Sequence, residues 1–140
     1  MLRRSAAILL FATCYGGAAA MEALPGYKTL FEVIKAGGGT RKIIVGDRVT
    51  VHATGTVKET GKKFWSTKDP GQKAFTYNAG VAQVITGWDQ GCLGMSVGEV
   101  RKLDIPADEG YGASGFPAWG IPANGGLQFE IEVVSIDLKK

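Results

Sequence analysis

The clearest alternation of hydrophobic and polar positions lies at residues 48–58. Small or branched apolar residues occupy every second position from Val49 to Val57, and polar residues lie between them. Side chains alternate between the two faces of a strand, so this period of two predicts a half-buried antiparallel strand. Residues 127–138 alternate in the same way but change phase at Val134. Such a change predicts a bulge, or a strand whose second face is also covered.

Shorter segments between turn signals predict the other elements. Glycine and proline separate segments rich in β-branched and aromatic residues, which favour strands. Residues 81–93 are expected to carry the only convincing helix. Gly87 and Gly91 make it a poor isolated helix, so packing must hold it. Further strands are expected at residues 29–35, 62–67, 73–77 and 99–105, with a brief apolar run at 43–45.

These elements indicate a single α+β domain. A chain of 140 residues is long enough to bury a real core. The expected architecture is an antiparallel sheet wrapped on the short helix, whose only large residue is Trp88. Residues 106–126 form the longest irregular segment and are rich in glycine, proline and aromatic residues. Loops of this length are usually functional or disordered, and the aromatic content favours an ordered loop that makes contacts.

Residues 1–20 differ in composition from the rest of the chain. Arg3 and Arg4 precede an apolar run, small residues follow it, and the segment contains no acid. This order is typical of a secretory signal peptide, and the run is too short for a stable membrane span. We therefore expect a leader that directs the protein to the endoplasmic reticulum lumen or out of the cell. A mitochondrial presequence and a cytosolic product that starts at Met21 remain alternatives.

Charge and cysteine content exclude several classes of function. Without Arg3 and Arg4 the chain keeps 14 of its 16 basic residues against 13 acidic ones. This near-neutral balance does not indicate the clustered basic surface that nucleic-acid binding usually needs. Cys92 is the only cysteine outside the expected leader, so we expect a buried structural thiol and no internal disulfide. His52, the single histidine, lies on the polar face of its strand, which does not support a catalytic triad.

The chain also lacks the motifs of metal and phosphate chemistry. No metal-ligand spacing and no phosphate-binding loop occurs, so we expect no metal and no cofactor. Aromatic residues gather instead at loops and element ends. A part of them fits the core, and the others fit a concave apolar pocket, which is the usual form of a small-ligand site. Trp88, in the stretch 84–91, is either a core residue or the floor of that pocket.

One reaction needs an apolar pocket and neither acid, base nor metal. Rotation about an X–Pro bond has a barrier of roughly 20 kcal/mol, which arises from the amide resonance that is lost as the bond twists. A dry pocket that grips the proline ring favours the less dipolar, twisted amide, and one donor to the carbonyl helps. Prolyl isomerisation is therefore our hypothesis for the activity.

Six short motifs follow one another in a specific order between residues 46 and 138. They are VTVHATG (49–55), GKKFWST (61–67), VITGWDQG (84–91), GMSVGE (94–99), YGASGFP (111–117) and FEIEV (129–133). In these motifs the chain resembles the tacrolimus-binding immunophilins, the FKBP-type peptidyl-prolyl isomerases, and especially their small plant-type members. The resemblance implies a curved antiparallel sheet of five to six strands around one short helix. The domain would span residues 29–140, with its core at 46–138, after a lead-in at 21–28.

The resemblance also implies a role for each pocket residue. Trp88 would be the floor under the proline ring, and the Ile85 backbone N–H and the Tyr111 hydroxyl would donate to bound carbonyls. The implied catalytic residues are Tyr111, Phe64, Trp88 and Ile85. The implied substrate-binding residues are Phe75, Val84, Ile121, Phe129, Trp65 and Phe116.

Several positions depart from the commonest family pattern. Ala53 stands where many members carry a pocket tyrosine, and Phe116 replaces a frequent histidine. Trp65 replaces an aspartate, and Pro70 falls near the place of that aspartate's usual arginine partner. The absence of both charged residues is physically reasonable, because either one without its partner would be a buried unpaired charge. One residue is inserted around Trp119.

The implied function is a peptidyl-prolyl isomerase that assists protein folding. Its implied partners are proline-containing polypeptides and macrolides of the tacrolimus and rapamycin type, with no nucleic acid and no membrane span after leader removal. We expect a monomer. The alternative is a proline- or macrolide-binding module that regulates a partner with little turnover, which the altered pocket rim favours.

Overall fold

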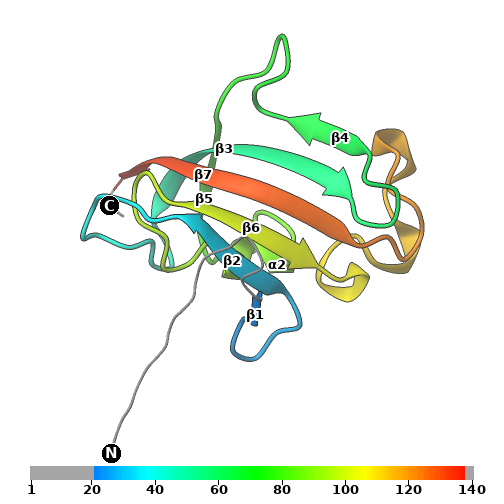
Figure 1. Ribbon diagram of the computed structural model, residues 1–140, viewed down its shortest axis with the longest axis horizontal. Coiled ribbons are helices and arrows are strands. Elements are labelled where there is room, and N and C mark those ends of the chain that lie inside the picture. The colour runs from blue at the N-terminus through cyan, green and yellow to red at the C-terminus, as the bar shows by residue number, and fades with distance from the viewer. Residues whose placement is uncertain (1–20, 138–140) are drawn as a thin grey trace, which may run out of the picture.

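The computed structural model describes residues 21–137 as one antiparallel sheet of seven strands with a short helix against it (Figure 1). The strand order is β1-β2-β6-β7-β3-β4, and β5 also pairs with β3. The expected α+β class is confirmed. The sheet gains a strand because β1 (Glu22–Ala23) pairs with β2 where only a lead-in was expected. The predicted leader lies outside the described residues.

The long central pair of the sheet consists of β3 (Arg48–Val57) and β7 (Leu127–Asp137). Every second residue of β3 is buried, so the predicted alternation is confirmed. Thr50 pairs with Ser135 and the next residue pairs with Val133, which leaves Val134 as the extra residue of a bulge. The phase change in the sequence is this bulge.

Shorter strands complete the sheet on both sides of the central pair. On one side β6 pairs with β7 and β2 pairs with β6. On the other side β5 and β4 pair with successive halves of β3. The ends of these four strands differ from the predicted ends by at most two residues. Their bounds are β2 (Leu30–Lys35), β4 (Lys63–Ser66), β5 (Phe75–Asn78) and β6 (Val100–Ile105).

Helix α2 spans only Thr86–Gly91, much less than the predicted residues 81–93. Ala82 has a left-handed backbone with φ 64°, and Ile85 is extended with ψ 153°, so neither residue continues a helix. The Asp89 carboxylate accepts hydrogen bonds from the Gly80 and Ala82 backbone N–H groups at 2.7 and 2.9 Å. The turn before the helix is therefore held by a side chain of the helix itself.

The two glycines of α2 let the helix approach the sheet closely. A Cβ atom at Gly87 would lie 2.6 Å from the Ile105 side chain, and one at Gly91 would lie 2.8 Å from Leu103. Both neighbours belong to β6 and are fully buried. The residues that weaken the helix on its own are thus the ones that allow its packing.

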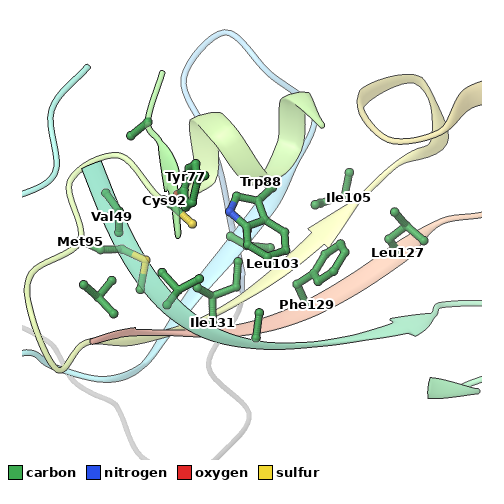
Figure 2. Packing of buried hydrophobic residues seen from close by; sticks show 14 of the residues in the cluster. Val49, Tyr77, Trp88, Cys92, Met95, Leu103, Ile105, Leu127, Phe129 and Ile131 are labelled. Carbon is green, nitrogen blue, oxygen red and sulfur yellow. The ribbon is translucent and has the colours of Figure 1, made fainter. Parts of the chain in front are cut away.

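The hydrophobic core lies between α2 and the concave face of the sheet (Figure 2). It includes alternate residues of β3 and β7 and the buried side chains of Trp88 and Cys92. The expected burial of Cys92 is confirmed. Within residues 21–137 no helix is long and apolar enough to cross a membrane.

The predicted long loop is ordered as three short 3-10 turns, η3 (Ala107–Glu109), η4 (Gly112–Ser114) and η5 (Pro117–Trp119). They gather near one end of the sheet, and the last of them, η5, lies beside β4 (orange in Figure 1). The Phe116 and Ile121 backbones pair with each other in an isolated bridge, and Ile121 is fully buried.

Glu109 ties this loop to the N-terminal part of the domain. Its carboxylate accepts hydrogen bonds from the Lys28 N–H at 2.8 Å, the Thr29 N–H at 2.9 Å and the Thr29 hydroxyl at 2.6 Å. Burial alone would raise the pKa of Glu109, but these hydrogen bonds outweigh burial and lower the pKa below its ordinary value.

The lowered pKa of Glu109 predicts a loss of stability in acid. A carboxyl group with a depressed folded-state pKa contributes stability above its unfolded-state pKa, and this contribution is lost as the pH falls through the folded-state pKa. Between about pH 7 and about pH 3, we expect Tm to fall more steeply for the wild type than for Glu109→Gln. Thermal melting across this range measures the difference. Glu22→Gln, on the exposed strand β1, is the control; equal slopes for the wild type and Glu109→Gln would contradict the prediction.

Candidate active site

A cavity of about 500 Å³ opens beside the first turn of α2. This volume lies within the usual range for small-ligand sites. The lining is mostly apolar and aromatic, and Lys73 is its only charged residue. The cavity is lined by Trp65, residues 71–75 and 83–85, Trp88, Tyr111, Trp119 and Phe129.

Trp88 belongs to both the core and the cavity wall. Its side chain is held by rings that meet it edge-on, with the Phe129 centroid at 4.9 Å and the Phe75 centroid at 5.8 Å. Edge-to-face contacts of this kind add to the free energy of burial. Because Trp88 is only 4% exposed, it cannot turn into the cavity without breaking the core.

Trp119 forms an outer wall of the cavity from the irregular segment. Its ring lies nearly parallel to Trp65, with centroids 6.5 Å apart, and also stacks on Phe64 at 6.2 Å. Trp65 and Phe64 are neighbours on β4, so a single loop residue covers two residues of the strand. Although Trp119 is 44% exposed, it is therefore held in place by aromatic contacts.

Gly55 makes room for two aromatic rings above β3. A Cβ atom at this position would lie 2.6 Å from ring atoms of both Phe64 and Phe129. These two rings meet edge-on, with centroids 5.7 Å apart. A side chain on residue 55 would push Phe129 toward the cavity or Phe64 toward Trp119.

Tyr111 reaches the cavity from the turn between η3 and η4. Its ring stacks on Phe116 at 5.4 Å, and Phe116 in turn meets Trp119 edge-on at 4.9 Å. Partial burial raises the pKa of Tyr111 above its ordinary value. The phenol therefore stays protonated at neutral pH and can donate a hydrogen bond.

Ile85 supplies a backbone donor beside Trp88. It is the N-cap residue of α2, where the backbone N–H has no partner within the helix. Its side chain is also part of the cavity lining. One polar hydrogen thus lies at an otherwise apolar wall.

The comparisons with known proteins agree on one family. A model of FKBP-type peptidyl-prolyl cis-trans isomerases matches residues 39–134. Peptidyl-prolyl cis-trans isomerase FKBP12 of Arabidopsis thaliana is 52% identical over 107 residues, which are 75% of this chain and 95% of that protein. The chain belongs to the FKBP-type peptidyl-prolyl cis-trans isomerases.

Two further relatives of this FKBP-type chain extend the comparison. Peptidyl-prolyl cis-trans isomerase FKBP12 of Vicia faba is 53% identical over 105 residues, which are 74% of this chain and 93% of that protein. FK506-binding protein 1 of Debaryomyces hansenii is 46% identical over 109 residues, which are 78% and 95% of the two chains. The higher identity to the two plant proteins agrees with the expected likeness to small plant-type FKBPs.

The FKBP cavity brings together most of the residues that the sequence predicted for it. Those that line it are Trp65, Phe75, Val84, Ile85, Trp88, Tyr111 and Phe129. Three others lie just outside the lining: Phe64 behind Trp119, Phe116 behind Tyr111, and Ile121 in the core. Their roles in binding and catalysis remain predictions.

Two parts of the lining were not predicted from the sequence: Trp119 and the polar rim at Gln72, Lys73 and Gln83. A tryptophan in a glycine-rich loop was a signal that could have identified the first. The rim residues gave no signal, because exposed glutamine and lysine are common on any surface.

Two of the residues that depart from the family pattern, Trp65 and Ala53, make specific contacts in the structure. Trp65, at the position where the resemblance implied an aspartate, stacks on Trp119. Ala53 is 2% exposed, and its backbone N–H donates a hydrogen bond to the Thr67 hydroxyl at 3.0 Å. Among residues 21–137, no group of histidine, cysteine and acidic side chains that could hold a metal ion is found.

Truncation of the Trp88 side chain is expected to lower the stability of the protein strongly. Trp88→Ala removes a buried ring from the core, and such changes cost about 3–5 kcal/mol in the free energy of unfolding. Denaturant unfolding measures the loss, with Val81→Ala, at an exposed position before the helix, as the control. A near-neutral effect of Trp88→Ala would mean that Trp88 is not a core residue.

Proposed function

We propose that this chain accelerates rotation about X–Pro bonds of polypeptides in the aromatic cavity. The observation that supports this function is Trp88, buried on its core side and part of the cavity wall, with the Phe75 and Phe129 rings edge-on around it. A proline ring is apolar and small enough to rest on the face of an indole. We assign the floor to Trp88 and the walls to Phe75, Val84 and Phe129.

The proposed mechanism uses desolvation and two donors. Water stabilises the planar, dipolar amide, so an apolar cavity lowers the energy of the twisted amide relative to the planar one. The Ile85 N–H holds a carbonyl of the bound chain next to the proline, and the Tyr111 hydroxyl donates to a second one. No proton is transferred and no covalent bond forms, so the reaction needs no general acid or base.

The alternative function is a binding module for proline segments or macrolides. The Trp65–Trp119 pair favours it, because two stacked indoles narrow the rim with rigid apolar surface. Relatives carry names such as FK506-binding protein 1, so a macrolide is the probe to use. Strong tacrolimus binding with negligible turnover would favour this alternative.

A protease-coupled assay on an X-Leu-Pro-Phe peptide tests the proposed activity. In this assay only the trans peptide is cleaved, so the rate of the slow phase reports isomerisation of the bond. We expect the protein to accelerate this phase and tacrolimus to suppress the acceleration. A rate equal to the uncatalysed one would rule out the isomerase.

Removal of the Tyr111 hydroxyl, the proposed side-chain donor, is expected to lower the isomerase activity. In Tyr111→Phe the ring and its stacking on Phe116 remain, and only the hydroxyl is lost. Because a neutral hydrogen bond contributes about 1 kcal/mol, we expect kcat/KM to fall about fivefold with little change in Tm. Tyr27→Phe removes an exposed hydroxyl far along the chain and serves as the matched control. Equal activity of both variants would remove Tyr111 from the mechanism.

We also propose that the mature protein acts as a monomer in the secretory pathway, after removal of residues 1–20. The composition of that segment supports this compartment. N-terminal sequencing of the protein from its native source tests it; a chain that begins at Met21 with an intact initiator would support the cytosolic alternative. Light scattering of the purified protein tests the monomer.

A further inference from the structure

The polar rim of the cavity carries a positive charge and no negative one. Gln72, Lys73 and Gln83 form this rim, and Lys73 is the only charged residue of the whole lining. The other residues around the cavity are mostly apolar or aromatic. A cation beside an apolar cavity is weakly screened on that side, because little water and no counter-charge lie between it and a bound ligand. The cavity therefore favours a ligand with a negative charge near its rim.

Lys73 has no acidic partner within the protein. Lys63 and Lys68, which precede it in the same part of the chain, pair with Asp69 at 2.6 Å and with Glu132 at 4.0 Å. The ion pairs among residues 21–137 include none that involves Lys73. Its side chain is exposed, so the ammonium group is free to meet a charge that a ligand brings.

The acidic residues on the neighbouring segments are already engaged. Asp69 pairs with Lys63, and its backbone carbonyl accepts a hydrogen bond from the Gln72 N–H at 2.9 Å, which closes the turn before Lys73. Asp89 follows the cavity floor in the chain, but it is only 3% exposed and its carboxylate accepts two backbone hydrogen bonds. Neither carboxylate competes with a ligand for Lys73.

Gln83 adds a hydrogen-bond donor to the same rim. Its side-chain oxygen accepts a hydrogen bond from the Asn78 backbone N–H at 2.8 Å, which leaves its NH2 group for other partners. Gln83 lies two residues before Ile85, whose N–H is the proposed donor to a carbonyl of the bound chain. An ionised carboxylate only accepts hydrogen bonds, so it suits a rim made of an ammonium group and an amide donor.

We propose that Lys73 is a specificity-determining residue, which selects polypeptides with an acidic side chain next to the proline. This inference rests on the proposed function, because it concerns which polypeptides the cavity turns over. The Lys73 ammonium attracts a glutamate or aspartate carboxylate at this position and repels a lysine or arginine. The bound chain displaces water from the rim, so this pairing is stronger than one between two fully solvated side chains.

Exchange NMR on two series of peptides, capped at both ends, tests the selection without a protease. In Ala-Xaa-Pro-Phe the variable residue precedes the proline, and in Ala-Leu-Pro-Xaa it follows the proline; Xaa is Glu, Gln or Lys. In at least one series we expect kcat/KM for the Glu peptide to exceed that for the Lys peptide about fivefold at low salt, with Gln between them. This ratio should fall toward one in about 1 M salt, where charges are screened within a few ångströms.

Charge variants assign the selection to Lys73. In Lys73→Gln the ratio of the Glu to the Lys peptide should fall to about one, and in Lys73→Glu it should reverse. Lys35→Glu is the matched control, because it changes the net charge by the same amount at an exposed end of β2, outside the cavity lining. We expect this control to keep the ratio of the wild type.

Three outcomes would overturn the proposal. They are no preference for Glu over Lys in either series, an unchanged ratio in Lys73→Glu, and the same reversal in Lys35→Glu, because the net charge would then select and not the rim. If no peptide is isomerised at all, the proposed function fails. The ratio of the Kd values for the Glu and Lys peptides, measured by NMR titration, then decides whether Lys73 selects its ligand.

Discussion

The close approach of helix α2 to strand β6 is the constraint on which the site depends. Gly87 and Gly91 bring the helix backbone onto Ile105 and Leu103, and any Cβ atom at either glycine would meet these side chains at less than 3 Å. Trp88 follows directly after Gly87, so this approach places its indole inside the sheet's concave face. A six-residue helix cannot be stable alone, and the glycines weaken it further. The position of the floor is thus set by tertiary packing and not by helix propensity.

The outer wall of the site is built from a segment with little secondary structure, so other contacts have to hold this segment in place. Glu109 fixes the start of this segment to Thr29, and the Phe116–Ile121 bridge fixes its far end through a fully buried isoleucine. Between these anchors, Trp119 stacks on two residues of β4. Aromatic surface therefore orders the loop and lines the cavity at the same time.

The sequence alone predicted the features that depend on local pattern. The alternation of β3, the phase change at Val134 and the linked motifs around Trp88 all follow from residues close together in the chain, although only the structure shows that the phase change is a bulge. The length of α2 was overestimated, because apolar residues at 81–85 fit a helix equally well and only the left-handed Ala82 and the extended Ile85 end it. The position of Trp119 opposite Trp65 joins residues 54 positions apart, which no local pattern reveals.

The same residues serve the core and the site, and this explains the chemistry of the cavity. A floor that is also core has to be apolar and rigid, which suits a reaction whose barrier is amide resonance and which needs no proton transfer. Lys73 is the only charged residue in the lining, and the raised pKa of Tyr111 keeps its phenol neutral. Apart from the rim residues Gln72, Lys73 and Gln83, the polar groups of this wall are neutral donors. The orientation of Trp88 is accordingly the property that the fold has to control, and the edge-on rings of Phe75 and Phe129 hold it.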